Sequence, residues 1–163
     1  KKKQLNESLM LFFTGISRFS SDVQKDTMSN QEKKLAQLKE MLSLVDDAQS
    51  ILESKHSNLN EFGRLLDHTW RLKRDTGGKI SNNSIDALYE RGLKAGALGG
   101  KLLGAGGGGF LLFYIEPDKK EALLKEFDEL MHVPFAFEDE GTSVVHYNPI
   151  VYIPRKELNL NFD

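Results

Sequence analysis

The chain has 163 residues, of which 28% are charged and 39% are hydrophobic, and this balance fits one folded domain, or one domain with a helical appendage. A net charge of −2 and the absence of any apolar run near the roughly 20 residues of a membrane span give no reason to expect nucleic acid or a membrane as a partner. The chain has no cysteine, which excludes disulfides and thiolate metal sites within it and fits a reducing, cytoplasmic location.

The first residues form a short basic segment, Lys1 to Gln4, with neither an initiator Met nor the apolar core of a signal peptide. We expect these lysines to be solvated and the chain to be a piece of a longer protein. The apolar run Leu9–Thr14 is typical of a strand that is buried on both faces. Ser17 or Ser20 is then expected to cap a short helix that reaches about Met28.

A long helix is predicted from Ser29 to Ser54. Ser29 and Glu32 have the spacing of a capping box. Apolar residues recur on one helical face, at Leu35, Leu38, Leu42, Val45 and Leu52. This spacing also occurs in coiled coils, but the run lasts under four heptads and Gln49 interrupts it, which favours a helix packed in a bundle.

Two further helices are predicted before the chain changes character. Asn58 is expected to cap the first, which ends in the basic stretch 71–74. A residue within 81–84 is expected to cap the second, whose apolar face consists of Ile85, Leu88, Tyr89 and Leu93. Gly92 leaves part of this helix bare, so we expect another element to approach it closely.

Strands dominate the remaining prediction. They are expected at Lys101–Leu103, Phe110–Ile115, Pro134–Glu138 and Ser143–Tyr147, with a hairpin turn at Glu140 and Gly141. A capping box at Asp118 and Glu121 predicts an intervening helix. The order of elements predicts an α+β fold, with an antiparallel sheet and helices on one face.

Glycine is concentrated in one segment, because eight of the 14 glycines lie between Gly96 and Gly109. Such a run can direct successive backbone N–H groups at an anion such as phosphate, with Lys101 as a nearby cation. It can equally form a tight hairpin where two backbones pack closely. The order of a Walker A loop is missing, and the strand that is expected to follow argues against a dinucleotide-binding turn.

The segment Gly96–Phe110, which reads GALGGKLLGAGGGGF, resembles the third conserved motif of the GHMP sugar kinases. The heptose 7-phosphate kinase branch of this superfamily is also similar at Thr14–Arg18, at Trp70–Arg74 and in the segment that starts at Ser81. The resemblance extends from Leu9 to Tyr147.

This resemblance implies a ferredoxin-like C-terminal kinase domain over residues 1–148, with a helical insertion at about 29–75 and a tail at 149–163. It implies the C-terminal half of an ATP-dependent sugar or sugar-phosphate kinase that uses ATP and Mg²⁺, with a heptose phosphate as the expected substrate. The main phosphate loop and the catalytic carboxylate would belong to an N-terminal half that this sequence does not contain. We therefore expect no catalytic residue here and no activity from this chain alone.

The expected site combines a backbone loop with a few cations. The loop consists of Gly104, Ala105, Gly106, Gly107, Gly108 and Gly109, with the amides of Gly106, Gly107 and Gly108 as donors to a phosphoryl group or to the phosphate loop. The candidate cations for a substrate phosphate are Arg18, Lys73 and Lys101, because Arg and Lys both suit phosphate. A basic residue at a helix end, as at Lys73, also needs no ligand to explain it. Metal-ligand spacing is absent, so no metal site is expected.

Two other classes of protein remain open at this stage. One is a non-catalytic ferredoxin-like module that binds a small metabolite, against which the long helical stretch 29–74 argues. The other is a helical interaction protein whose partner surface is the Leu35–Leu52 face.

Overall fold

The computed structural model of the chain describes residues 1–16, 31–144 and 146. The helices in this part are α1 (Lys2–Ser8), α3 (Gln31–Glu53), α4 (Asn60–Asp75), α5 (Asn83–Lys94) and α6 (Lys120–Glu126), the last preceded by a 3₁₀ turn, η1 (Pro117–Lys119). The strands are β1 (Leu9–Phe13), β2 (Gly99–Leu102), β3 (Phe110–Tyr114) and β4 (Met131–His132). Over these residues, no helix is both long enough and apolar enough to cross a membrane. The helix expected near 17–28 and the tail expected at 149–163 lie outside the described residues.

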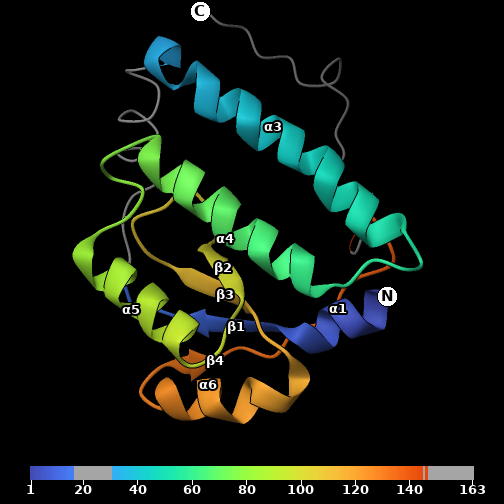
Figure 1. Ribbon diagram of the computed structural model, residues 1–163. Coiled ribbons are helices and arrows are strands. Elements are labelled where there is room, and N and C mark those ends of the chain that lie inside the picture. The colour runs from blue at the N-terminus through green and yellow to red at the C-terminus, as the bar shows by residue number, and fades with distance from the viewer. Residues whose placement is uncertain (17–30, 145, 147–163) are drawn as a thin grey trace, which may run out of the picture.

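The strands form one antiparallel sheet in the order β2-β3-β1-β4, which confirms the α+β prediction (Figure 1). The register places Met10 opposite Phe113 and Phe12 opposite Leu111. Side chains alternate across a strand, so these four residues share one face of the sheet. All four are buried.

Helices α5 and α6 cover this buried face. Phe113 lies against Tyr89 of α5 and against Phe127, at the end of α6, with ring centroids 5.8 and 5.6 Å apart. Gly92 allows the close approach that its bare backbone predicts, since a Cβ there would lie 2.4 Å from a ring atom of Phe113. Helix α4 packs along the outer strand β2, as Figure 1 shows.

The opposite face of the sheet is covered only in part. At one end, Leu9 and Tyr114 are buried with Leu5 of α1 and with apolar side chains of α4. At the other end, Phe13 is half-buried, and it meets Phe110, which is 39% exposed, with ring centroids 5.1 Å apart. The less covered end is the end next to the glycine-rich segment.

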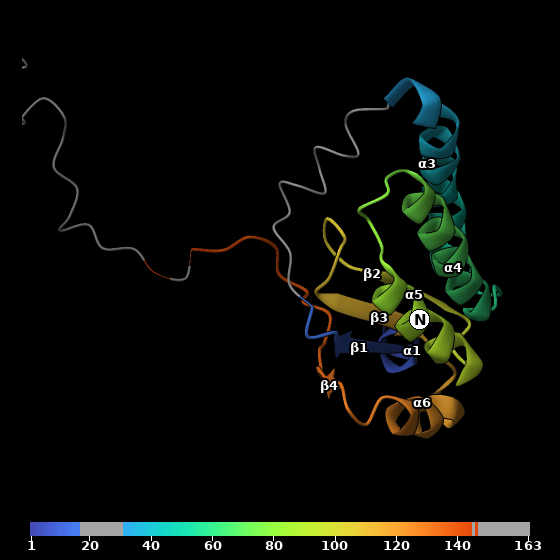
Figure 2. The ribbon, with the colours of Figure 1, turned by 90° about the vertical axis from the view of Figure 1, so that its left-hand side faces the viewer.

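The predicted long helix is present as α3, which packs against α4 on the side away from the sheet (Figures 1 and 2). Most of the apolar stripe singled out in the sequence is nevertheless exposed: Leu35 by 51%, Leu38 by 43%, Leu42 by 70% and Val45 by 58%. Its last member, Leu52, is half-buried and packs against the cluster of Leu5, Leu9 and Tyr114. Half-buried residues lie on another side of the helix, at Met41, Leu44, Ala48 and Ile51.

Three predictions about where elements begin differ from the structure. Lys1 is half-buried rather than solvated, because its ammonium donates to the carbonyl of Ile51 over 2.6 Å, and α1 follows it. Asn58 lies one residue before the N-cap of α4, where its side chain accepts from the amide of Asn60 at 2.9 Å. The capping box at Asp118 does not form, because η1 precedes α6 and the N-cap residue of α6 is Lys119, without a side-chain bond.

The predicted strand at Pro134–Glu138 is wrong, as is the described part of the one at Ser143–Tyr147, and the fourth strand is β4 instead. The amide of Val133 still donates to the carbonyl of Leu11, but Pro134 has no N–H, so pairing cannot continue. Asn6 of α1 then holds the segment by its side chain, through the carbonyl of Phe135 and the amide of Phe137. Tyr147 itself lies outside the described residues.

Candidate functional site

The glycine-rich run is a hairpin connection between β2 and β3, closed by the amide of Leu103 on the carbonyl of Phe110 at 2.8 Å. Within it, Gly104, Gly106, Gly107 and Gly109 have positive φ angles of 78°, 112°, 79° and 103°. Residues with a Cβ rarely adopt this backbone, so the turn explains much of the glycine content. We call residues 104–109 the glycine loop.

The end of β1 holds the last part of the glycine loop. Thr14 donates twice to the carbonyl of Gly109, from its amide at 2.8 Å and from its hydroxyl at 2.9 Å. The amide of Gly109 donates to the carbonyl of Ile16 at 2.8 Å. A Cβ on Gly108 would lie 2.3 Å from that same carbonyl oxygen, so glycine is required for this approach.

The segment before α5 holds the middle of the glycine loop. The amide of Gly107 donates to the carbonyl of Ile80 at 2.8 Å, and the side-chain amide of Asn82 donates to the carbonyl of Gly107 at 3.2 Å. Gly106 also lies against this segment, since a Cβ there would be 2.7 Å from the carbonyl oxygen of Ile80. Ile80 is a buried core residue, so the contact fixes the loop to the body of the domain.

One of the three predicted cations contacts the start of the glycine loop, and a second lies near the first. Lys73, near the end of α4, donates from its ammonium to the carbonyl of Gly104 at 2.7 Å. Burial lowers the pKa of Lys73, and the charge of Lys101 on β2 lowers this pKa further, so the two cations lie close enough to interact. Arg18, the third predicted cation, lies outside the described residues.

The backbone donors differ from those expected in one respect. The amide of Gly107 is occupied by Ile80, so it is not free to bind an anion in this conformation. Within the described residues, the amides of Gly104, Ala105, Gly106 and Gly108 make no hydrogen bond. The loop therefore has four amides without a partner among the described residues, and they include two of the three expected.

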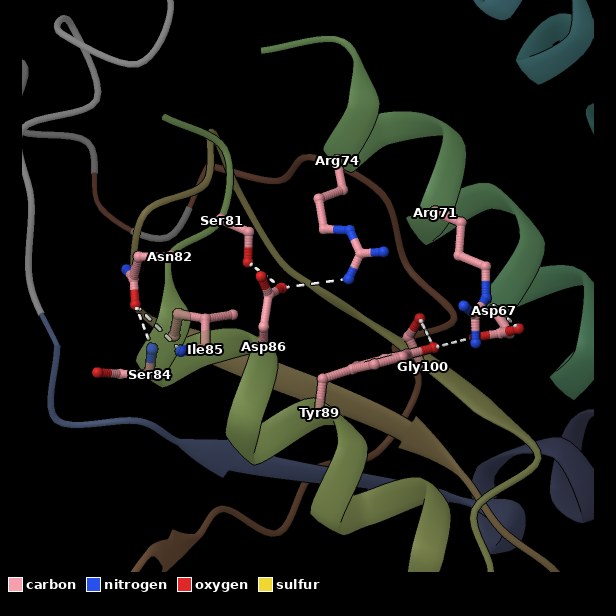
Figure 3. Close-up of polar contacts among 10 residues, drawn as sticks. All are labelled: Asp67, Arg71, Arg74, Ser81, Asn82, Ser84, Ile85, Asp86, Tyr89 and Gly100. Atoms are coloured by element: carbon pink, nitrogen blue, oxygen red, sulfur yellow. Dashed lines mark hydrogen bonds and ion pairs between the residues drawn. The ribbon is translucent and has the colours of Figure 1, made fainter. Parts of the chain in front are cut away.

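A polar network joins α4 to α5 and to Ser81, which lies between Ile80 and Asn82 in the chain (Figure 3). Asp86 of α5 accepts from Ser81 at 2.7 Å and lies 3.3 Å from the guanidinium of Arg74, so Arg74 is engaged away from the loop. Asp67 of α4 accepts from Tyr89 at 2.7 Å and from Arg71 at 2.8 Å. Burial, followed by this bond to Asp67, raises the pKa of Tyr89, which therefore stays a donor.

A polar hollow of about 580 Å³ adjoins the glycine loop. It is lined by Ile16, Gly78, Ser81, Asn82, Asn83 and Ser84. Two of these residues, Ile16 and Asn82, also bond to the loop, so the hollow lies beside the loop. The described residues contain no group of three or more His, Asp or Glu side chains that could hold a metal ion. Lys73, Lys101 and the free amides of the glycine loop suit phosphate oxygens rather than a divalent cation.

Sequence reasoning did not identify Thr14, Ile16, Ile80 or Asn82 as partners of the glycine loop. Their segments did carry a signal, because Thr14–Arg18, Trp70–Arg74 and the stretch from Ser81 are the ones that strengthened the family resemblance. The structure shows what the described parts of the three have in common: each contains, or directly adjoins, a residue bonded to the glycine loop. Trp70 itself is fully buried in the core, 6.0 Å from the ring of Tyr89.

Comparison with known protein families matches residues 48–133, more than half of the chain, to the model described as GHMP kinases C terminal. A D-glycero-alpha-D-manno-heptose 7-phosphate kinase of Campylobacter jejuni is 31% identical over 143 residues, which cover 85% of this chain and 41% of that protein. A bifunctional fucokinase/GDP-fucose pyrophosphorylase of Arabidopsis thaliana is 26% identical over 127 residues, or 76% of this chain and 12% of that protein. The chain thus spans less than half the length of these relatives.

Solved structures share the fold. The mevalonate kinase of Methanococcus jannaschii matches with a TM-score of 0.67 at 24% identity, over 80% of this chain and 40% of that one. The mevalonate kinase of L. major, in complex with R-mevalonate, matches with a TM-score of 0.64 at 22% identity, over 79% and 43%. At such identities the likeness is one of fold.

Proposed function

Since the chain belongs to the GHMP kinase family, whose members are ATP-dependent kinases that use Mg²⁺, we propose that it is the C-terminal half of an ATP-dependent sugar or sugar-phosphate kinase. The glycine loop completes the phosphoryl-transfer site, and the rest of that site belongs to an N-terminal half. The chain spans 41% of the Campylobacter jejuni relative, which supports a protein of two halves.

The observation that carries this proposal is one loop with four free amides, contacted by the ammonium of Lys73 and with Lys101 close enough to interact with Lys73. Phosphoryl transfer requires positioning and the stabilisation of negative charge more than covalent protein chemistry. Lys73 and Lys101 supply point charges, and the free amides of the loop supply directional donors. Because the charge of Lys101 lowers the pKa of Lys73, an anion close to both would relieve that repulsion.

The other components of the reaction are proposed to lie outside this chain. ATP supplies the phosphoryl group, and the N-terminal half supplies the main phosphate loop, the carboxylate that acts on the sugar hydroxyl and the Mg²⁺ contacts. In this arrangement the glycine loop binds the charge that develops on the transferred group. The chain alone is then inactive.

A heptose phosphate is the substrate we propose, on the strength of the name of the Campylobacter jejuni relative. A substrate that already carries a phosphate needs a second anion contact, and Arg18 is proposed for it because guanidinium binds phosphate in a bidentate manner. Arg18 follows Ile16 by two residues in the sequence, and Ile16 accepts from the amide of Gly109, which supports this proposal.

The test is an assay of ATP-dependent phosphorylation by the whole protein, with heptose phosphates and other sugars as acceptors. Lys73→Met and Lys101→Met are each expected to lower kcat/KM about 10- to 100-fold, as the loss of a charge-stabilising group does elsewhere. Lys55→Met is the matched control, since Lys55 is exposed and follows α3. Full activity in the double lysine variant, or a folded wild-type protein that phosphorylates no sugar, contradicts the proposal.

A further inference from the structure

Asn82 connects two structures that otherwise have little in common, the first turn of α5 and the glycine loop. Its side-chain oxygen accepts from the amides of Ser84 and Ile85, both at 3.0 Å, which makes it the N-cap of α5 (Figure 3). Since the oxygen faces these two donors, the nitrogen of the same amide group faces the carbonyl of Gly107, at 3.2 Å. One side chain thus satisfies a helix end and holds a loop carbonyl.

Because the peptide bond is planar, the contact of Asn82 with the carbonyl of Gly107 also orients the N–H of Gly108. In a trans peptide, the carbonyl of one residue and the N–H of the next point in opposite directions. Because Asn82 holds the carbonyl of Gly107, the N–H of Gly108 is directed away from the segment before α5. This N–H is among the loop amides that make no hydrogen bond within the described residues.

The peptide between Gly107 and Gly108 needs a hydrogen bond to fix its orientation. The plane between Gly107 and Gly108 has no Cβ on either side, so it can rotate with little steric resistance. A hydrogen bond to the carbonyl favours one of its two orientations. On the other side of Gly107, its own amide is fixed by the buried residue Ile80, so rotation there would break a second bond.

We propose that Asn82 is a positioning residue that orients the amide of Gly108 toward the transferred phosphoryl group. This rests on the proposed kinase function for the identity of the anion. The orientation itself depends only on contacts within this chain. Asn82 acts through Gly108 and contacts neither reactant, so its loss is expected to affect the charge-stabilising step more than substrate binding.

The variants separate the two roles of Asn82. Asn82→Ser and Asn82→Asp keep an N-cap oxygen and lose the donor to Gly107, whereas Asn82→Ala loses both. Asp also adds a charge that repels phosphate, so Ser is the decisive variant. Asn58→Ser is the matched control, because Asn58 also accepts a backbone amide before a helix, and α4 separates it from the loop in sequence.

The measurement uses the whole protein with [¹⁵N]glycine labelling and a titration with inorganic phosphate. Wild type and Asn58→Ser are expected to show a phosphate-dependent shift of the Gly108 amide. Asn82→Ser is expected to lose it and to exchange the Gly107 amide about 2- to 10-fold faster, the range for one neutral hydrogen bond. Its kcat is expected to fall by a similar factor while KM for the sugar stays unchanged, with the melting temperature held by the serine cap.

The outcomes distinguish this inference from the function on which it rests. An unchanged Gly108 response in Asn82→Ser, or no response of Gly108 to phosphate in wild type, overturns the role of Asn82. Loss of the response in a wild-type-like fold supports it. If the response depends on Asn82 but the wild-type protein phosphorylates no sugar, then the positioning holds and the kinase proposal fails.

Discussion

The glycine loop and helix α3 are held in opposite ways. The loop has almost no side chains to pack, yet hydrogen bonds fix its backbone. Its carbonyls accept from Thr14, Lys73 and Asn82, and its amides donate to the carbonyls of Ile16 and Ile80. Helix α3 has a regular apolar stripe, yet four of its large side chains are more than 40% exposed. Apolar periodicity therefore reports the helix but not its burial, and a segment without side chains can be the better fixed of the two.

The largest effect should come from a Cβ inside the loop. Gly106→Ala forces a residue with φ near 112° to carry a side chain 2.7 Å from the carbonyl oxygen of Ile80, and we expect a loss of about 3 kcal/mol in unfolding free energy. Gly104→Ala meets only open space, so its backbone strain should cost about 1 kcal/mol. Urea denaturation measures both, and equal losses would show that the close approach to Ile80 does not matter.

Thr14→Val should have the next largest effect on stability. The variant keeps the shape of a buried side chain and removes its hydroxyl. The variant loses the bond to the carbonyl of Gly109 and the bond from the amide of Ile16, which together should lower the unfolding free energy by about 1 to 2 kcal/mol. Thermal unfolding with hydrogen exchange at Gly109 tests it. Wild-type stability with unchanged exchange would mean that the β1 end does not hold the loop.

Substitutions on the exposed side of helix α3 should lower the unfolding free energy much less. Leu42→Ala changes a side chain that is 70% exposed, so we expect a loss below about 0.5 kcal/mol, typical of the surface. The matched substitution Leu102→Ala removes a fully buried side chain and should cost about 3 kcal/mol. Urea denaturation of this chain measures both losses. Equal losses of unfolding free energy in the two variants would contradict the difference in burial between the two regions.

The smallest effect concerns the ionisation of Lys73. Its pKa is lowered by burial and then by Lys101, so the unfolded chain binds more protons between that pKa and the ordinary lysine value of 10.5. Lys73 therefore makes stability rise with pH across this window. In Lys101→Met the pKa of Lys73 should move back only partly, because burial remains. NMR titration of the lysine side chains checks this, and an unchanged pKa would place Lys101 too far away to interact.

The sequence predicted best what depends on neighbouring residues. The strands β1 and β3, the cap at the start of α5 and the close contact at Gly92 all follow from local patterns, and they are present in the structure. The order of these elements predicted the α+β fold with an antiparallel sheet, which the structure confirms.

What the sequence could not predict depends on distant partners. Asn82 and Gly107 are 25 residues apart, and Lys73 and Gly104 are 31 apart, so no local pattern joins them. The exposure of the α3 stripe depends on which side of the helix meets α4. The missing strand at Pro134–Glu138 had a local cause, the proline, but Asn6 of α1 decides where that segment lies instead.

The position of β1 in the sheet also has a consequence for how the domain folds. The hairpin β2–β3 closes across a short loop, whereas β1 pairs with β3 between Leu9 and Tyr114, about a hundred residues apart in the chain. Closing a loop of that length is entropically slow compared with hairpin formation. We expect the hairpin, with its glycine loop, to form first, and the sheet to wait for β1. Thr14 and Ile16 follow β1, so their hydrogen bonds with Gly109 would form in the last stage of folding.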